Sequence, residues 1–243
     1  MTSDCCKSGF AWNGTPTGTE TKVAGINTYV TGDSKSAAIF MIHDIFGWTF
    51  NNLRVLADHF AKEADATVYL PDFFGGEVIP EETLTNPELK AKVNIGAFLG
   101  RHNKAIRYPE MVAVAKELKS KYPKVGGTGY CYGGWALFKL GADPELIDAV
   151  SVSHPSLLDK SEIDALKVPV QINAPETDGQ LTPELKEYVN KVIPTLNIPY
   201  EYVYYPGLVH GFATRANLND KRQKDGLERA KNATANFLKE FLH

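Results

Sequence analysis

The stretch that decides the fold is residues 124–140, Lys-Val-Gly-Gly-Thr-Gly-Tyr-Cys-Tyr-Gly-Gly-Trp-Ala-Leu-Phe-Lys-Leu. Residues 124–130 predict a buried strand, and residues 135–140 predict a helix. Between them, Gly129-Tyr130-Cys131-Tyr132-Gly133 has the form Gly-x-nucleophile-x-Gly. In that setting the reactive side chain sits on a sharp strand-to-helix turn, and the flanking glycines leave room for the helix to pack closely on the strand.

This turn has two chemical consequences for Cys131. The thiol projects from the top of the sheet at a helix N-terminus, where the helix dipole favours the thiolate. The backbone N–H of Tyr132 is free to bind an oxyanion. The alternative is a buried cysteine acting as a small hydrophobe, the commoner role of a lone cysteine. The strand-Gly-x-Cys-x-Gly-helix context favours the nucleophile.

Strand and helix patterns alternate along the rest of the chain. This alternation predicts a single α/β domain over residues 1–243, with a mostly parallel central sheet, helices on both faces and an irregular arm at 1–20. In such sheets ligand sites lie beyond the carboxyl ends of the strands. The expected strands are 23–30, 37–42, 67–70, 124–130, 148–152, 168–173 and 200–205, and the expected helices are 53–64, 107–121, 135–140, 183–193 and 227–241.

A thiol nucleophile needs a base, and the base needs a third group that orients it. His210 is the candidate base, because it lies in a loop between the last expected strand and the last helix. Asp178, in an Asp-Gly turn after the preceding strand, is the candidate orienting acid, with Glu176 as the fallback. His210 could instead be a loop histidine bonded to backbone, and either acid a simple turn-former. His154 is expected to be a neighbour of the site.

The loop His43-Asp44-Ile45-Phe46-Gly47-Trp48 follows the continuous apolar run 37–42. The N–H of Ile45 is the expected second oxyanion donor. Asp44 ends a buried strand and is expected to face the same site; the alternative is that it caps a turn or pairs with a surface base. Aromatic residues near the expected site predict a small, partly aromatic pocket: Phe46, Trp48, Phe73, Phe74, Tyr130, Tyr132 and Phe212.

Together these motifs resemble the dienelactone hydrolase (carboxymethylenebutenolidase) family of the α/β-hydrolase superfamily. The resemblance spans roughly residues 22 to 242 and rests on Gly-Tyr-Cys-Tyr-Gly-Gly, Asp-Ile-Phe-Gly, Pro71-Asp72-Phe73-Phe74, Asp178 and His210-Gly-Phe. The opening Cys-Cys-x-x-Gly with Trp12-x-Gly-x-Pro is similar to the fungal branch of the family.

The resemblance implies an α/β-hydrolase fold that cleaves a small ester or lactone with a Cys131–His210–Asp178 triad, through an acyl-thioester. It also implies that Asp44 holds a resting thiol, which becomes a thiolate when an anionic substrate engages Arg215. Phe46, Trp48 and Phe212 would contact the substrate. Bacterial members have Glu in place of this Asp and a second arginine where this chain reads Gly75-Gly76-Glu77, and Arg215 lies one residue further from the histidine.

The amino-acid composition excludes some classes of binding partner and favours one cellular compartment. A net charge of −3 argues against nucleic acid or an anionic membrane, and the expected partner is a small-molecule ester or lactone. The expected oligomeric state is a monomer or weak homodimer. The N-terminus lacks the apolar core of a secretory signal, and three cysteines suit a reducing cytosol, which is the predicted location. Cys5 and Cys6 are interpreted as structural or incidental. No metal-ligand spacing or dinucleotide fingerprint is present, which predicts no cofactor and no metal.

Two other functions stay open. The same triad could act on a larger natural-product or xenobiotic ester, with the Gly75–Gly100 stretch as a mobile cap. Alternatively, the fold could serve a ligand-binding or thiol redox protein in which Cys131 does not turn over substrate.

Overall fold

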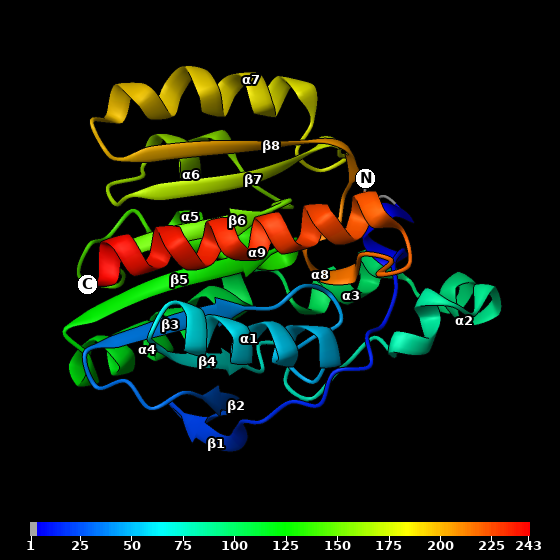
Figure 1. The fold of residues 1–243 in the computed structure, drawn as a ribbon, viewed down its shortest axis with the longest axis horizontal. Coiled ribbons are helices and arrows are strands. Elements are labelled where there is room, and N and C mark those ends of the chain that lie inside the picture. The colour runs from blue at the N-terminus through cyan, green and yellow to red at the C-terminus, as the bar shows by residue number, and fades with distance from the viewer. Residues whose placement is uncertain (1–3) are drawn as a thin grey trace.

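An eight-stranded sheet runs through the computed structural model, which describes residues 4–243 (Figure 1). The strands are β1 (Thr19–Val23), β2 (Ile26–Thr31), β3 (Ala37–Ile42), β4 (Thr67–Pro71), β5 (Lys124–Tyr130), β6 (Ala149–Ser153), β7 (Val170–Thr177) and β8 (Tyr200–Val209). Their order in the sheet is β1-β2-β4-β3-β5-β6-β7-β8. The β1–β2 and β2–β4 pairs are antiparallel, and every other pair is parallel.

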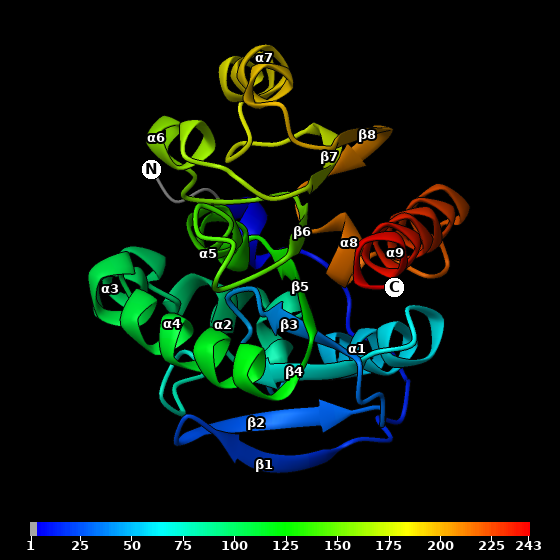
Figure 2. The same cartoon turned by 90° about the vertical axis from the view of Figure 1, so that its left-hand side faces the viewer.

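Helices cover both faces of this sheet. Figure 2 shows α1 and α9 on one side and α4, α5 and α6 on the other. The predicted α/β fold with a mostly parallel sheet is therefore confirmed. The helices are α1 (Asn51–Glu63), α2 (Pro87–Lys92), α3 (Ile95–Arg101), α4 (Lys104–Lys121), α5 (Tyr132–Leu140), α6 (Lys160–Asp164), α7 (Pro183–Val192), α8 (Phe212–Arg215) and α9 (Lys221–Leu242), with 3₁₀ turns at Asp4–Lys7, Glu81–Leu84 and Ile193–Leu196.

The centre of the sheet explains why the apolar runs form strands. All six residues of β3 are buried, as expected for a strand covered by helices on both faces. Burying a side chain such as Phe40 or Ile39 contributes roughly 1.5–3 kcal/mol relative to leaving it in water. On the outside, α9 turns Leu227, Ala230 and Phe237 inward, and Asp220 caps its start by accepting the N–H of Gln223.

The N-terminal part of the sequence differs from expectation. The expected strand 23–30 is a hairpin whose turn, at Ala24 and Gly25, has positive φ angles of 49° and 78°. The first strand was missed because Thr19–Lys22 is polar and exposed, as befits a sheet edge. The arm is also not irregular throughout, since Asp4–Lys7 forms a 3₁₀ turn and β1 begins at Thr19. Residues 1–3 of the predicted arm lie outside the described residues.

The functional elements gather at one end of the sheet. β3 and β5 are neighbours, yet the chain leaves β3 toward β4 on one side and returns to β5 on the other. Loops separate at such a crossover and leave space for a ligand beyond the carboxyl ends of the strands. Figure 1 shows the N-terminal arm, α8 and the α2–α3 segment at this end, on the right.

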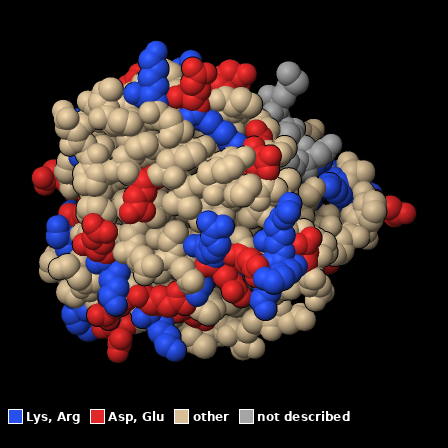
Figure 3. Space-filling model, turned by 45° about the horizontal axis from the view of Figure 1, so that its top comes forward, with Lys and Arg blue, Asp and Glu red and all other residues tan. Residues whose placement is uncertain are grey.

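The surface shows no concentration of one charge on the face drawn in Figure 3. There, Lys and Arg side chains are interspersed with Asp and Glu. Among residues 4–243, no helix is long and apolar enough to cross a membrane.

Candidate active site

Cys131 occupies the turn between β5 and α5 in a strained conformation. Its φ of 49° and ψ of −109° lie outside the regions that a non-glycine residue prefers. Close backbone approach explains the glycines around it: a Cβ on Gly129 would lie 2.7 Å from the Gly133 carbonyl oxygen, and one on Gly133 would lie 2.3 Å from that of Ile42. The turn therefore presents the Cys131 side chain above the sheet between the ends of β3, β5 and β6.

His210 and Asp178 are paired, as the predicted triad requires. The Nδ1 atom of His210 lies 2.9 Å from both carboxylate oxygens of Asp178, and both side chains are fully buried. The carboxylate also accepts the N–H groups of Gln180 at 2.7 Å and Leu181 at 3.1 Å, which fixes its orientation. Glu176, the fallback acid, is exposed and instead accepts the N–H of Gly207.

The thiol of Cys131 lies against a second thiol. Its Sγ is 3.8 Å from the Sγ of Cys6 and 3.3 Å from the Oγ of Ser156, and the Sγ of Cys6 is 3.7 Å from Nε2 of His210. The interpretation of Cys6 as structural or incidental did not place it in the site, where the structure puts its thiol against Cys131 and His210. Nothing in the local sequence indicates this role, because Cys6 is on a polar arm and 125 positions from its partner. The side chain of Cys5 lies outside the described residues.

The electrostatics of the thiol and imidazole favour an ion pair. The hydrogen bond with Cys6 is the largest influence that holds the pKa of Cys131 well below its usual value of 9.0; burial opposes it, and His210 and Arg215 support it. Burial alone would lower the pKa of His210, but the Cys131 thiolate and Asp178 together raise it to about 10. A thiolate beside an imidazolium is an activated nucleophile with its acid already in place.

Asp44 and Arg215 form a second buried pair beside the triad. Nη1 of Arg215 donates to the Asp44 carboxylate, and both side chains have no exposed surface. Asp44 also accepts the Phe46 N–H at 3.0 Å and the Thr214 hydroxyl at 3.1 Å. Burial raises the pKa of Asp44 more than Arg215 lowers it. The resemblance implied that Asp44 holds the thiol; in this structure it bonds Arg215, Thr214 and Phe46 instead.

Arg215 is also tied to the N-terminal arm. Its Nε donates to the Ser8 carbonyl at 3.0 Å, and its own carbonyl accepts the N–H of Phe10 at 3.0 Å. Nη2 is buried and has no hydrogen-bond partner among the described residues. An anionic group entering the site would find a donor there.

The two expected oxyanion donors lie just beyond the ends of the neighbouring strands β3 and β5. Ile45 follows β3 within a tight turn in which the Gly47 N–H donates to the Asp44 carbonyl at 3.1 Å. Tyr132 is the first residue of α5, so its N–H has no acceptor within the helix. The hydroxyl of Tyr132 donates to the His102 carbonyl at 2.7 Å.

Only some of the aromatic residues predicted to line the pocket lie near the triad residues. The guanidinium of Arg215 lies 5.3 Å from the ring centre of Phe46, and Phe212 packs 5.7 Å from His154. Trp48 is not brought to the thiol, because its indole packs 4.9 Å from the guanidinium of Arg54 on α1. Phe73, Phe74 and Tyr132 form core ring pairs instead, Phe40–Phe73, Phe74–Phe98 and Phe74–Tyr132, whereas Tyr130 lies against His154.

His154 is a buried neighbour of the triad, as expected. Its ring lies 4.9 Å from that of His210, and neither ring nitrogen has a hydrogen-bond partner among the described residues. Burial, then the charges of His210 and Arg215, hold its pKa well below the usual value. The ring is therefore neutral at neutral pH and cannot compete with His210 for the thiol proton.

A cavity of about 270 Å³ opens beside the histidine. It lies between arm residues 8–10 and the segment 207–212, and it is also lined by Arg215 and Gln223. Cys131 is not among the lining residues and is only 1% exposed. Cys6 of the arm thus lies against the thiol, and the cavity opens on the His210–Arg215 side.

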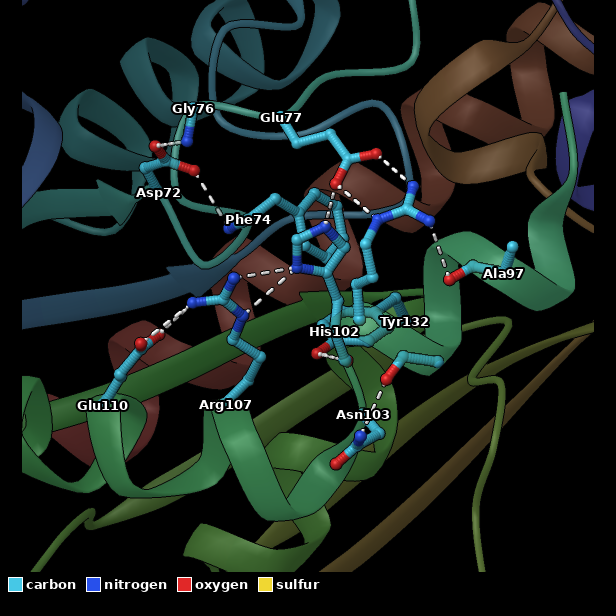
Figure 4. A network of polar contacts seen from close by, with 12 residues as sticks. Asp72, Phe74, Gly76, Glu77, Ala97, His102, Asn103, Arg107, Glu110 and Tyr132 are labelled. Carbon is cyan, nitrogen blue, oxygen red and sulfur yellow. Dashed lines mark hydrogen bonds and ion pairs between the residues drawn. The ribbon is translucent and has the colours of Figure 1, made fainter.

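A charged network joins the two ends of the segment 75–103, the cap segment, and links them to α4 (Figure 4). Glu77 pairs with Arg101 at 2.5 Å and with Nε2 of His102 at 2.8 Å. Arg107 donates to Nδ1 of His102 and binds Glu110. The stretch where bacterial relatives carry a second substrate arginine thus supplies an acid that is already occupied by Arg101 and His102.

The sheet order, the strained turn after β5 and the acid–histidine pair after β7 and β8 define an α/β-hydrolase. Comparison with known proteins gives the particular family. Residues 26–242 match the dienelactone hydrolase family, and the chain belongs to it. As a member, the protein is an ester or lactone hydrolase.

Relatives with known names are hydrolases, and solved structures share the fold. The hydrolase pyvD of Aspergillus violaceofuscus is 29% identical over 99% of this chain and 97% of its own length. The hydrolase tropI of Talaromyces stipitatus is 30% identical over 88% of this chain and 87% of its own. The dienelactone hydrolase structure from Anabaena variabilis superposes with a TM-score of 0.62 at 15% identity, covering 93% of this chain and 96% of that one.

Proposed function

We propose that the protein hydrolyses a small ester or lactone with Cys131 as nucleophile, His210 as acid and base, and Asp178 as the group that orients His210. One observation carries the proposal: the Asp178–His210 pair faces a cysteine on a strained strand-to-helix turn, with 2.9 Å between Nδ1 and the carboxylate. This is the spatial relation of nucleophile, base and orienting acid that acyl transfer requires.

The reaction proceeds in two halves. The Cys131 thiolate attacks the carbonyl carbon, and the N–H groups of Ile45 and Tyr132 stabilise the oxyanion. The C–O bond to the leaving group then breaks, and the imidazolium of His210 gives its Nε2 proton to the leaving oxygen. In a lactone this oxygen stays attached to the acyl group, so the ring opens. Neutral His210 next takes a proton from water, the hydroxide attacks the thioester, and the thiolate leaves.

The size of the opening favours a small substrate. The cavity beside His210 holds about 270 Å³, at the low end for ligand sites. The unpaired Nη2 of Arg215 offers a donor to a substrate carboxylate. Phe46 and Phe212 supply apolar contacts next to this arginine and histidine. A larger ester would require the cap segment or the N-terminal arm to move.

We further propose a cytosolic location. The Sγ atoms of Cys6 and Cys131 lie 3.8 Å apart without a disulfide bond between them, and a reducing compartment keeps such a pair unlinked. Fractionation of cells that express the full chain with a tag at its C-terminus tests this. Recovery in a secreted or membrane fraction would contradict it.

The mechanism is tested by hydrolysis of p-nitrophenyl acetate and a panel of lactones with and without a carboxylate. Cys131→Ala and His210→Ala are expected to lose nearly all activity, whereas His59→Ala, a change on the exposed side of α1, is expected to keep it. Arg215→Met is expected to reduce the preference for carboxylated substrates. Equal rates in wild type, Cys131→Ala and His210→Ala would overturn the proposal.

A further inference from the structure

Cys6 has no part in the proposed reaction, yet it lies among the reacting groups. The Sγ atoms of Cys6 and Cys131 and a ring nitrogen of His210 all lie within 4.8 Å of one another. All three residues are buried, at 5%, 1% and 3% exposure. They are scattered along the sequence, with His210 204 positions from Cys6, so no ligand spacing could reveal the cluster.

Two of the three distances between these atoms match those of a tetrahedral zinc site, and the third, between Cys131 Sγ and the His210 ring nitrogen, is within 4.8 Å. With zinc–sulfur bonds of about 2.3 Å and zinc–nitrogen bonds of about 2.0–2.1 Å, two thiolates are separated by about 3.8 Å, and a thiolate and an imidazole nitrogen by about 3.6 Å. The structure has 3.8 Å between the two Sγ atoms and 3.7 Å between Cys6 Sγ and His210 Nε2. An ion could enter between these atoms with little movement of the side chains.

The residues around this cluster orient the histidine and balance the charge of a divalent ion. Asp178 binds Nδ1 of His210, and so it leaves Nε2 as the coordinating atom, as in carboxylate–histidine–zinc arrangements. Two thiolates neutralise a divalent ion within the buried site. The nearest other charges, Asp44 and Arg215, already neutralise each other.

We propose that Cys6, Cys131 and His210 bind Zn²⁺ or a similar soft divalent ion, and that this ion reversibly blocks the enzyme. Any proton on a coordinating thiol passes to water, and a water molecule takes the fourth position. Coordination removes the nucleophile and the base together. Thiolate and imidazole ligands favour Zn²⁺ over Mg²⁺ or Ca²⁺. Only the inhibitory consequence rests on the proposed function; the site itself does not.

The N-terminal arm makes the site specific, because it delivers the third ligand. Cys6 is on the 3₁₀ turn Asp4–Lys7, and the next residues are fastened to the body. The Ser8 hydroxyl accepts from Lys90 of α2 at 2.8 Å, and the carbonyl of Phe10 accepts from Asn52 of α1 at 2.8 Å. Removal of the Cys6 thiol leaves only two ligands in an otherwise intact site.

The test uses Co²⁺ as an optical probe with the full chain carrying Cys5→Ser, so that only Cys6 and Cys131 can supply thiolates. We expect one Co²⁺ per chain, with the visible bands of tetrahedral coordination and thiolate charge-transfer absorption, displaced by Zn²⁺. Adding Cys6→Ser should weaken Co²⁺ binding at least about 100-fold, since even outer-shell changes cost 10–100-fold. It should also halve the charge-transfer intensity of the remaining complex.

Further variants show whether weaker Co²⁺ binding comes from loss of a ligand or from misfolding. His210→Ala should also weaken binding, His59→Ala should not, and circular dichroism should show each variant folded. If Cys6→Ser misfolds, Cys6→Ala takes its place. Absence of tetrahedral bands, unchanged affinity in both Cys6 variants, or loss of binding caused by Cys5→Ser alone would overturn the proposal.

The readout separates the two proposals. If Co²⁺ binds as expected but wild type hydrolyses no ester, the metal site stands and the proposed function fails. If ester hydrolysis depends on Cys131 but Co²⁺ does not bind, the function stands and the metal site fails.

Discussion

Two charged clusters lie at the same end of the sheet, and they differ in how much water reaches them. In the active site, the side chains of Asp44, Arg215, Asp178 and His210 have no exposed surface. In the cap segment, Glu77 and Arg101 are 39% and 56% exposed. Both clusters join segments far apart in sequence, and both show short ion pairs.

Similar ion-pair geometry has different energetic consequences in the two clusters. A buried ion left without its partner costs about 3–5 kcal/mol, because water cannot replace the lost partner. At the surface, water and salt replace the partner, and the pair contributes little. The active-site pairs therefore fix both stability and chemistry, whereas the cap network mainly positions a loop.

The largest expected effect is on catalysis at Asp178. Asp178→Asn keeps the shape of the side chain but no longer stabilises the imidazolium of His210. We expect kcat to fall by about 10⁴-fold, as for other triads that lose this carboxylate. Steady-state hydrolysis of p-nitrophenyl acetate measures it. Glu176→Gln, a matched change on the neighbouring exposed acid, should leave kcat within about twofold of wild type; a comparable loss in both variants would contradict the assignment.

The next effect is on stability at Arg215. Arg215→Ala leaves Asp44 buried without its partner, which is expected to cost about 3–5 kcal/mol and to lower Tm by roughly 6–20 °C. The Tm values of the variants and of wild type are measured by thermal unfolding monitored with circular dichroism. Arg101→Ala, the equivalent change in the exposed cluster, should lower Tm far less. Equal shifts in the two variants would show that burial does not distinguish the clusters.

The third prediction concerns pH. Burial opposes a proton on His210, but the Cys131 thiolate and Asp178 prevail and raise its pKa from 6.5 to about 10. This shift stabilises the fold fully below pH 6.5, and the stabilisation is lost as the pH rises through about 10. Because the imidazolium protonates the leaving group, kcat/KM should be flat across neutral pH and fall as the pH rises toward 10.

The ultraviolet absorbance of the thiolate is the direct check on this ion pair. The pKa of Cys131 is lowered, chiefly by the hydrogen bond with Cys6, so the thiolate should persist well below pH 9.0. His210→Ala should move the thiol–thiolate transition upward. A wild-type transition near pH 9.0 would contradict the ion pair.

The smallest effect is expected at Glu77. Its hydrogen bond with Arg101, supported by His102, lowers its pKa from 4.5 to about 2. Any stabilisation is therefore present above pH 4.5 and lost as the pH falls toward 2. Because the pair is exposed, Glu77→Gln should lower Tm by less than about 2 °C at neutral pH. A larger shift, insensitive to salt, would show that the cap network is structurally essential.

Much of the fold was predictable because its signals are local. The apolar run of β3, the strand–turn–helix around Cys131 and the amphipathic α9 each carry their pattern within a few residues. The edge strand β1 was missed because its residues are polar and exposed. The helices α2, α3, α6 and α8 are short, and α2 buries none of its residues, so their periodicity is weak.

The site was predictable where the chain order of the fold carries it. Asp178 and His210 each follow a strand, and the structure pairs them. Cys6 and the partner of Asp44 were not predictable, since each depends on contacts across more than a hundred positions. The contact between Cys6 and Cys131 cannot be read from the sequence, because the local sequence of an arm says nothing about where the arm docks.

The most direct test of the central claim is to trap the acyl-enzyme. Wild type is mixed with p-nitrophenyl acetate, quenched in acid during the burst, digested, and mapped by mass spectrometry. The account predicts one acetyl group on the peptide that contains Cys131, absent from Cys131→Ala and released slowly in His210→Ala. Acetyl groups on Cys6 or Ser156 in place of Cys131, or no covalent adduct during turnover, would contradict it.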